Sequence, residues 1–428
     1  MATAKTDRWG APVQSGTGAG VTHFDNAVES LVGLRGDPLV AADAAVGADD
    51  ELVLGHILRA YLSLYSTSAD GVRRAAKILE PLAGTDSTLS ERELLHLRAA
   101  RSWVAGEWDS ATHFLERALL HDSHDLLALK VAQDLYFLLG ETKELQGVVT
   151  RALRAWSAER LGWGYVQGMY AFGLEENGDY AQAEVFARAA LHRNPCDIWA
   201  VHALAHVLEM QGRPREGIAF LTDAAPEWSS SYFATHLWWH QALYHLTLGE
   251  IERAVSLYDG PIRRDRSAEW LDLIDAASLL WRLSLFGVDI GLRASELTAD
   301  IEPLIDDPTY IFNDWHAVMA FGMAGRHDLT ERLLTSNRRR THGTNRAVAE
   351  QAGLALLEGF DSFAARRFSR ALDILTHTQP IASAVGGSHA QRDIITLTIV
   401  EATARVGEHL TALDLAYPEG RSLNATNQ

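Results

Sequence analysis

Two pairs of histidines in the sequence have a spacing that supports chemistry on a helix. His202 and His206 form the first pair, and His236 and His240 form the second. A spacing of four residues puts both imidazoles on one helix face. Such a pair can bind a divalent metal with a carboxylate as third ligand, and Glu209 lies one turn beyond the first pair. The same rings can instead act as acid and base around a bound molecule.

The histidines also have a purely structural interpretation. Imidazoles in a helical protein can form a polar packing network in which each ring is hydrogen-bonded to a neighbouring helix. The metalloprotease signature His-Glu-x-x-His is absent, because Ala203 follows the first histidine. We expect no cofactor, and a divalent metal at the first pair and Glu209 is the weaker alternative. The candidate catalytic residues are His202, His206, Glu209, His236 and His240.

The composition argues against several classes of protein. Of 428 residues, 47% are hydrophobic, which is ample material for a core. The 38 basic and 56 acidic residues give a net charge of -18, which repels nucleic acid and anionic lipid. The single cysteine, Cys196, excludes an intrachain disulfide and a thiolate metal cluster. Without a secretory signal or a membrane span, we expect a cytoplasmic protein that binds neither nucleic acid nor membranes.

A recurring pattern of small residues indicates which elements position the candidate side chains. After Gly178 come Ala183, Ala187 and Ala190, and then Pro195. Small residues at these offsets after a turn glycine let a second helix pack tightly on the first, and the proline ends that helix. A glycine recurs at a spacing of 34 residues in three pairs: Gly106 and Gly140, Gly178 and Gly212, and Gly325 and Gly359. This period is typical of tetratricopeptide repeats, in which each repeat is a helical hairpin.

The sequence therefore predicts an all-α fold, a right-handed superhelical solenoid of tetratricopeptide-like helical hairpins. We expect one solenoid over residues 23–417, between a ragged N-terminal segment, 1–22, and a C-terminal tail, 418–428. Helix-forming residues dominate and alternating strand patterns are absent. More than about two-thirds of the residues should be helical, with essentially no strands.

Several short motifs resemble a known family of repeat proteins. The motifs are Asp125–Lys130, Asp134–Gly140, Val201–Met210, His236–His240, Phe312–Asp314 with His316, and Gly386–Asp393. Together they resemble the tetratricopeptide repeat protein 38 family, and the resemblance runs over roughly residues 20–410. It implies a single superhelix of helical hairpins, but it assigns no catalytic residues.

The repeat register predicts which side chains face the concave groove. In stacked hairpins the first helix of each pair lines the groove, at positions about ten, six and three residues before the turn glycine. Before Gly212 these positions are His202, His206 and Glu209. The hairpins that turn at residues 140, 178 and 249 add further candidate ligand-binding residues: Lys130, Asp134, Glu175 and Trp239.

Some acidic candidates have simpler explanations than ligand binding. Lys130 and Asp134 can form an exposed i,i+4 bridge of little energetic weight. Asp272 and Asp275 stand at the start of a predicted helix, where either can serve as a cap. Both interpretations remain open beside a ligand role.

The last candidate ligand-binding residues lie in the C-terminal third of the chain. Asp314 and His316 fall near a predicted helix start, where Asp314 or Asn313 would cap the helix. Ser388 follows a glycine pair and would cap the next helix. With Arg392, the same turn would equally make an anion site.

Three functions fit these residues. The first is a binding module that holds a small molecule or short peptide in a histidine- and acid-lined concave groove. The second is an enzyme that uses the same His/Glu/Asp cluster for acid–base or metal-assisted hydrolysis of a small molecule. The third is a protein–protein scaffold. The groove carries one lysine among its histidines and acids, which favours a small or cationic ligand, and analogy with other repeat proteins puts binding first. A homo-oligomer is compatible with the sequence.

Overall fold

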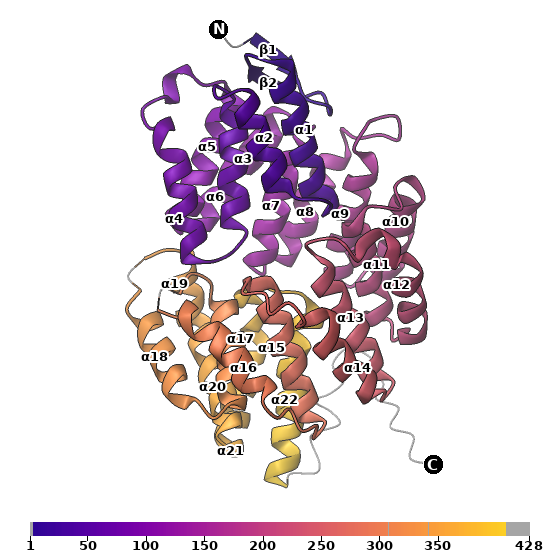
Figure 1. Ribbon diagram of the computed structural model, residues 1–428, viewed down its shortest axis with the longest axis vertical. Coiled ribbons are helices and arrows are strands. Elements are labelled where there is room, and N and C mark those ends of the chain that lie inside the picture. Colours follow the sequence, from indigo (N-terminus) through magenta and orange to yellow (C-terminus); the bar gives the residue numbers. More distant parts are fainter. Residues whose placement is uncertain (1–2, 307, 341, 408–428) are drawn as a thin grey trace. The chain divides into compact units, whose positions relative to one another are not determined.

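The computed structural model describes residues 3–306, 308–340 and 342–407, and it is 75% helical (Figure 1). The predicted all-α fold of tetratricopeptide-like hairpins is therefore confirmed. Among the described residues, no helix combines the length and the apolar character needed to cross a bilayer. The tail expected at 418–428 lies outside the described residues.

The chain divides into two compact units, which we describe separately. Unit 1 comprises Met1–Val207, Leu221–Ala234 and His342–Asn345, and unit 2 comprises Leu208–Phe220, Thr235–Thr341 and Arg346–Gln428. The expectation of one continuous domain over residues 23–417 stays a prediction.

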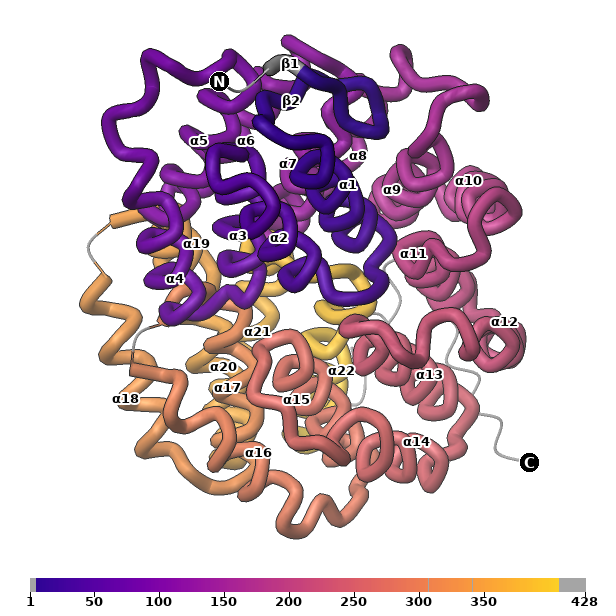
Figure 2. Tube along the Cα trace, turned by 45° about the horizontal axis from the view of Figure 1, so that its top comes forward, coloured from indigo at the N-terminus to yellow at the C-terminus, as the bar shows by residue number. Residues whose placement is uncertain are grey.

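Unit 1 is a row of antiparallel helical hairpins. Its consecutive helices pack as the pairs α1/α2, α3/α4, α5/α6, α7/α8 and α9/α10, and each pair also contacts the next (Figure 2). The helices are α1 (Gly18–Gly33), α2 (Pro38–Ala48), α3 (Val53–Leu64), α4 (Ala69–Leu79), α5 (Glu91–Val104), α6 (Trp108–His121), α7 (Leu126–Leu138), α8 (Thr142–Leu153), α9 (Trp163–Glu176) and α10 (Tyr180–Arg193), with 3₁₀ turns at Glu80–Leu82 and Asp86–Thr88. The boundary with unit 2 runs through α11 (Ile198–Met210) and α12 (Pro214–Trp228).

Unit 2 packs around two central helices. Helix α15 contacts α16, α17 and α22, and helix α17 contacts α16, α18 and α20. The helices are α13 (Ala234–Thr247), α14 (Ile251–Leu257), α15 (Trp270–Leu285), α16 (Arg293–Ile301), α17 (Ile311–Met323), α18 (His327–Arg338), α19 (Thr344–Val348), α20 (Leu354–Ala364), α21 (Phe368–Thr378) and α22 (His389–Val406). Short 3₁₀ or π turns lie at Tyr258–Ile262, Glu302–Leu304, Ala349–Gly353 and Gln379–Val385.

The N-terminal segment is more regular than the sequence suggests. Strand β1 (Thr3–Thr6) pairs antiparallel with β2 (Pro12–Ser15), so that Lys5 lies opposite Val13. This hairpin falls in the stretch 1–22 that was expected to be ragged. Four-residue strands are too short to show an alternating pattern, which is why the sequence did not predict them.

The periodic glycines are hairpin turns, with one exception. Positive φ angles, between 65° and 83°, occur at Gly106, Gly140, Gly178, Gly212, Gly249 and Gly325. Gly359 was expected to be another turn, but it lies inside α20, where an added Cβ would come within 2.5 Å of Leu375. The turn between α20 and α21 is instead made by Arg366, at a φ of 60°.

This turn predicts an unusual gain of stability. An L-residue in the left-handed region costs about 1–2 kcal/mol, and glycine costs about 0.5–1 kcal/mol in unfolded-chain entropy. Arg366→Gly should therefore raise the free energy of unfolding by about 0.5–1 kcal/mol in urea titrations. The matched change Gly178→Ala, at a φ of 83°, should lower it by a similar amount. A loss of stability in Arg366→Gly would contradict the assignment of this turn.

Candidate functional site

In the two hairpins α7/α8 and α9/α10 of unit 1, the buried ionisable side chains lie on the first helix of each hairpin. Helix α7 buries Lys130 and Asp134, and helix α9 buries Glu175 and Glu176. Among the described residues, the second helices α8 and α10 bury only apolar side chains: Leu145, Val148, Val149, Ala152, Ala183, Ala187 and Ala190. The register read from the glycines predicted Lys130, Asp134 and Glu175 on the first helices, and they lie there. That these side chains face a concave groove stays a prediction.

Lys130 and Asp134 form a buried ion pair. Nζ of Lys130 lies 2.7 Å from Oδ1 of Asp134, and the two residues are 1% and 9% exposed. The hydroxyl of Tyr65 donates to Oδ2 of Asp134 at 2.7 Å. The interpretation as an exposed bridge is wrong, because both residues are buried. The electrostatic attraction between the two charges is stronger there than in water.

The N-terminal end of α11 adds an aromatic ring and a carboxyl group beside this pair. Nζ of Lys130 lies 3.7 Å from the ring centroid of Trp199, a cation–π contact. Burial raises the pKa of Asp197 to about 7, against the opposing effects of the Ala200 amide and the charge of Lys130. The carboxyl group of Asp197 therefore titrates near neutral pH.

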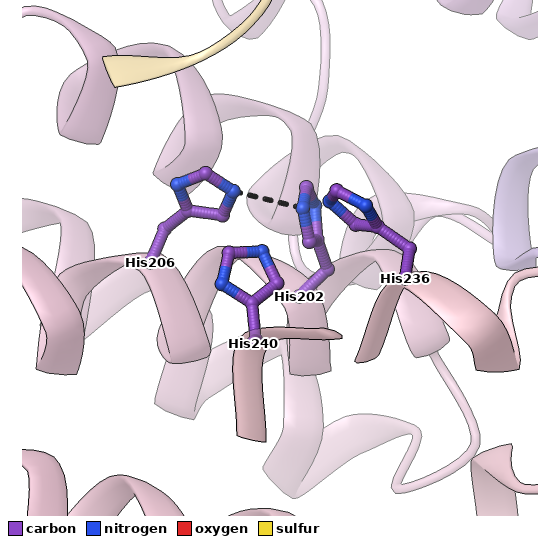
Figure 3. Close-up of side chains that lie close together, drawn as sticks. All are labelled: His202, His206, His236 and His240. Carbon is purple, nitrogen blue, oxygen red and sulfur yellow. Dashed lines mark hydrogen bonds between the residues drawn. The ribbon is translucent and has the colours of Figure 1, made fainter. Parts of the chain in front are cut away.

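The first histidine pair also belongs to this part of unit 1. Nε2 of His206 lies 2.9 Å from Nε2 of His202 (Figure 3), and its Nδ1 lies 3.6 Å from Oε2 of Glu175. Both imidazoles pack on the ring of Phe172, with centroids 5.3 and 5.4 Å away. One imidazole must donate to the other, so the protonation states of the two rings are coupled. We call the set Lys130, Asp134, Glu175, Trp199, His202 and His206 the polar wall of unit 1.

The second histidine pair, on α13, binds carboxylates of unit 2. Nδ1 of His236 lies 3.0 Å from both carboxylate oxygens of Asp275, and Nδ1 of His240 lies 2.9 Å from Oε2 of Glu209. Figure 3 shows the two rings on α13. Burial, together with the nearby His236 and Arg282, lowers the pKa of His240 well below its ordinary value. His240 is therefore neutral and donates to Glu209.

The capping interpretation of Asp275 is wrong. Helix α15 is preceded by Glu269, which makes no side-chain capping bond, and Asp275 lies in its second turn. Burial raises the pKa of Asp275, and the neighbouring His236 offsets only part of this rise. Trp239 stacks on the ring of His236 with centroids 5.2 Å apart, and the guanidinium of Arg282 lies 5.4 Å from the Trp239 ring.

The capping interpretation of Asp314 is also wrong. Helix α17 has Tyr310 as its N-cap without a side-chain bond, so Asp314 lies in the first turn and accepts from Nδ2 of Asn337 at 2.9 Å. Burial raises the pKa of Asp314 to about 6. Nδ1 of His316 donates to the Phe312 carbonyl at 2.8 Å, and burial lowers the pKa of His316 to about 3.

Ser388 caps α22, as the first of its two interpretations expected. Its hydroxyl accepts from the Gln391 amide at 3.2 Å, and the Gln391 side chain accepts from the Ser388 amide at 3.0 Å. The guanidinium of Arg392 donates to the carbonyls of Gly386 and Gly387. This turn therefore satisfies its own polar groups, and an anion site here stays a prediction.

Reasoning from the sequence missed several side chains of these sites. Asp197, Trp199 and Glu176 in unit 1 were not named as candidates, and the pairing of Asp275 with His236 in unit 2 was not predicted. Trp199 precedes His202 by three residues, a helical spacing that places the two on one face. This spacing was the one available signal, whereas the partner of Asp275 is 39 residues away in sequence.

The pKa of Asp197 predicts a dependence of stability on pH. Between its ordinary value of 3.8 and about 7, the folded state holds a proton that the unfolded state has lost. This term therefore makes the protein less stable as the pH rises through that window, by up to about 1.4 kcal/mol per pH unit. Asp197→Asn keeps the bond from the Ala200 amide and removes the titration. Relative to the parent, it should gain stability from pH 5 to pH 7 in urea unfolding, and a constant difference would contradict the assignment.

No model of a known protein family matches the chain. Among solved structures, it resembles human IFIT1 in a dimer with m7Gppp-AAAA, at 13% identity and a TM-score of 0.43, over 85% of this chain and 88% of that one. The Cut9–Hcn1 hetero-tetramer of APC/C gives 16% identity and a TM-score of 0.43, over 91% and 68% of the two chains. The TPR domain of P58(IPK) gives 13% identity and a TM-score of 0.22, over 91% and 99%.

These similarities are too low to transfer a ligand or an activity. The repeated hairpins and their turn glycines carry the classification. The chain has a tetratricopeptide-like repeat fold, and its place in the tetratricopeptide repeat protein 38 family stays a prediction.

Proposed function

We propose that the protein binds a small molecule or short peptide at the polar wall of unit 1. One observation carries the proposal: ionisable groups are buried on α7 and α9, while α8 and α10 bury only apolar side chains. Burying charges costs several kcal/mol, which even a well-formed ion pair often only offsets, and apolar side chains would fill the same space at no such cost. A function other than packing explains why these groups are present.

The chemistry of the wall favours a ligand that carries charges of both signs. Lys130 offers an ammonium and Asp134 a carboxylate, and the Trp199 ring lies against the ammonium. A zwitterionic ligand, such as a free amino acid or a dipeptide, would place its carboxylate at Lys130 and its ammonium at Asp134. Small-molecule sites typically orient their ligand with a few convergent polar groups among hydrophobic and aromatic side chains, as this wall would.

The experiment is a thermal-shift screen with the free amino acids and a set of dipeptides. A hit is then titrated into the parent and into Trp199→Phe, Lys130→Arg and the control Lys143→Arg, which lies at the exposed start of α8. We expect at least tenfold weaker binding in the first two variants and unchanged binding in the control. Equal affinities in all four proteins would refute a ligand site at the wall.

A second function is supported by the pair of His236 and Asp275. A buried carboxylate that holds Nδ1 of an imidazole fixes its tautomer, so that Nε2 can act as a general base. Hydrolysis of p-nitrophenyl esters and dipeptides by the parent, with His236→Gln and Asp275→Asn as comparisons, tests this alternative. A hydrolysis rate that both variants leave unchanged would exclude this pair as the catalytic group.

A further inference from the structure

We propose that Glu175, Glu176 and His206 of unit 1 form a binding site for a divalent transition-metal cation. This inference goes beyond the proposed function and does not depend on it, because the cation alone is the probe. The site differs from the metal alternative drawn from the sequence, which combined the first histidine pair with Glu209.

The three side chains bring suitable donor atoms together. One carboxylate oxygen from each glutamate and one imidazole nitrogen of His206 all lie within 4.8 Å of one another. The contact between His206 Nδ1 and Glu175 Oε2 is 3.6 Å. Donors bound to one cation at about 2.0–2.2 Å lie about 3–3.5 Å apart, so side-chain adjustments of roughly 1 Å would bring all three donors to binding distance.

Burial separates this cluster from an ordinary acidic patch. Glu175 is 0% exposed, Glu176 is 1% exposed and His206 is 0% exposed. Two carboxylates this close and this deep repel one another unless a proton or a cation lies between them. If the imidazole of His206 is neutral, the donor set carries the two negative charges of the glutamates, which a divalent cation would balance.

His202 orients the imidazole that would bind the cation. Its Nε2 lies 2.9 Å from Nε2 of His206, on the side of the ring away from Nδ1. If the Nε2–H of His206 donates to His202, then Nδ1 of His206 carries the lone pair that faces Glu175. Metal-binding histidines are commonly held in this way through the second ring nitrogen. His202 is thus a positioning residue.

The charge of Lys130 does not oppose a cation here. Lys130 shares the polar wall, but its ammonium is 2.7 Å from the carboxylate of Asp134. The opposite charges of Lys130 and Asp134 therefore largely cancel in their effect on the side chains of α9. A donor set of two carboxylates and one imidazole suits zinc or manganese.

The test uses the full chain after chelator treatment, titrated calorimetrically with ZnCl₂ and with MnCl₂. We expect one cation per chain, and at least tenfold weaker binding in Glu175→Gln, Glu176→Gln and His206→Gln. His202→Asn should weaken binding about tenfold while keeping the imidazole nitrogen signal in pulsed EPR of the Mn²⁺ form. That signal should vanish in His206→Gln.

Matched controls locate the cation. Glu144→Gln and His113→Gln change exposed residues of α8 and α6 and should bind as the parent does, as should His236→Gln. Circular dichroism checks that each variant is folded, and the EPR spectrum of the parent tests the nitrogen ligand without any variant. A parent that binds neither cation, a parent spectrum without a bound nitrogen, or binding lost in His236→Gln but kept in Glu175→Gln would overturn the inference.

Discussion

Replacing Asp125 by asparagine is expected to lower the free energy of unfolding by about 3–5 kcal/mol, because it weakens two charge-assisted hydrogen bonds of the buried Arg92 and leaves Asp7, at 3.0 Å, as its carboxylate partner. The Asp125 carboxylate accepts from Nε and Nη2 of Arg92 at 2.7 and 3.0 Å, and it lies 3.0 Å from Nε2 of His96. It also caps α7 through the Ala128 amide at 3.1 Å. Asparagine keeps the cap and removes the charge.

The same carboxylate makes unit 1 sensitive to acid. Burial alone would raise the pKa of Asp125, but Arg92 and His96 outweigh burial and hold the pKa below its ordinary value of 3.8. A lowered pKa means that the stabilisation is fully present above about pH 4 and is lost as the pH falls further. In strong acid the parent loses this stabilisation too. The free energies of unfolding of Asp125→Asn and the parent should therefore differ little there.

Asp86→Asn is the matched control for Asp125. Asp86 pairs with Arg101 at 3.0 Å, but its side chain is 42% exposed. Solvent-exposed pairs contribute little, so this variant should unfold at nearly the same urea concentration as the parent. If both variants lose the same small amount, the Arg92–Asp125 pair is not a strong stabilising interaction.

Lys130→Met is also expected to lower the free energy of unfolding by about 3–5 kcal/mol, because it leaves the buried carboxylate of Asp134 without its ammonium partner. The triple change Lys130→Met, Asp134→Leu and Tyr65→Phe removes the ion pair and the hydroxyl that donates to it. Buried ion pairs replaced by apolar side chains are often neutral or stabilising. The triple variant should therefore unfold at the same urea concentration as the parent or above it. A deficit as large as that of the single variant would mean that the pair is needed for packing.

Local patterns explain how much of the fold the sequence could predict. The turn glycines fixed the hairpins because positive φ angles strongly favour glycine, as at Gly178. The same logic failed at the α20/α21 turn, where Arg366 takes that conformation and Gly359 serves close packing instead. A spacing of 34 residues between glycines does not distinguish these two uses.

The candidate sites were predicted only in part for a different physical reason. The repeat register placed Lys130, Asp134 and Glu175 on the first helices, since it depends on spacing along one helix. The ion pair was read as exposed, because burial depends on neighbouring helices. The partner of His236 was missed for the same reason, since Asp275 comes from another helix.

The most direct test of the polar wall as a ligand site compares binding with stability in the triple variant. The zwitterionic ligand identified by the thermal-shift screen is titrated calorimetrically into the parent and into Lys130→Met/Asp134→Leu/Tyr65→Phe, and both proteins are unfolded in urea. We expect at least tenfold weaker binding in the triple variant at equal or higher stability. Undiminished binding by a stable triple variant would contradict a ligand site at the polar wall.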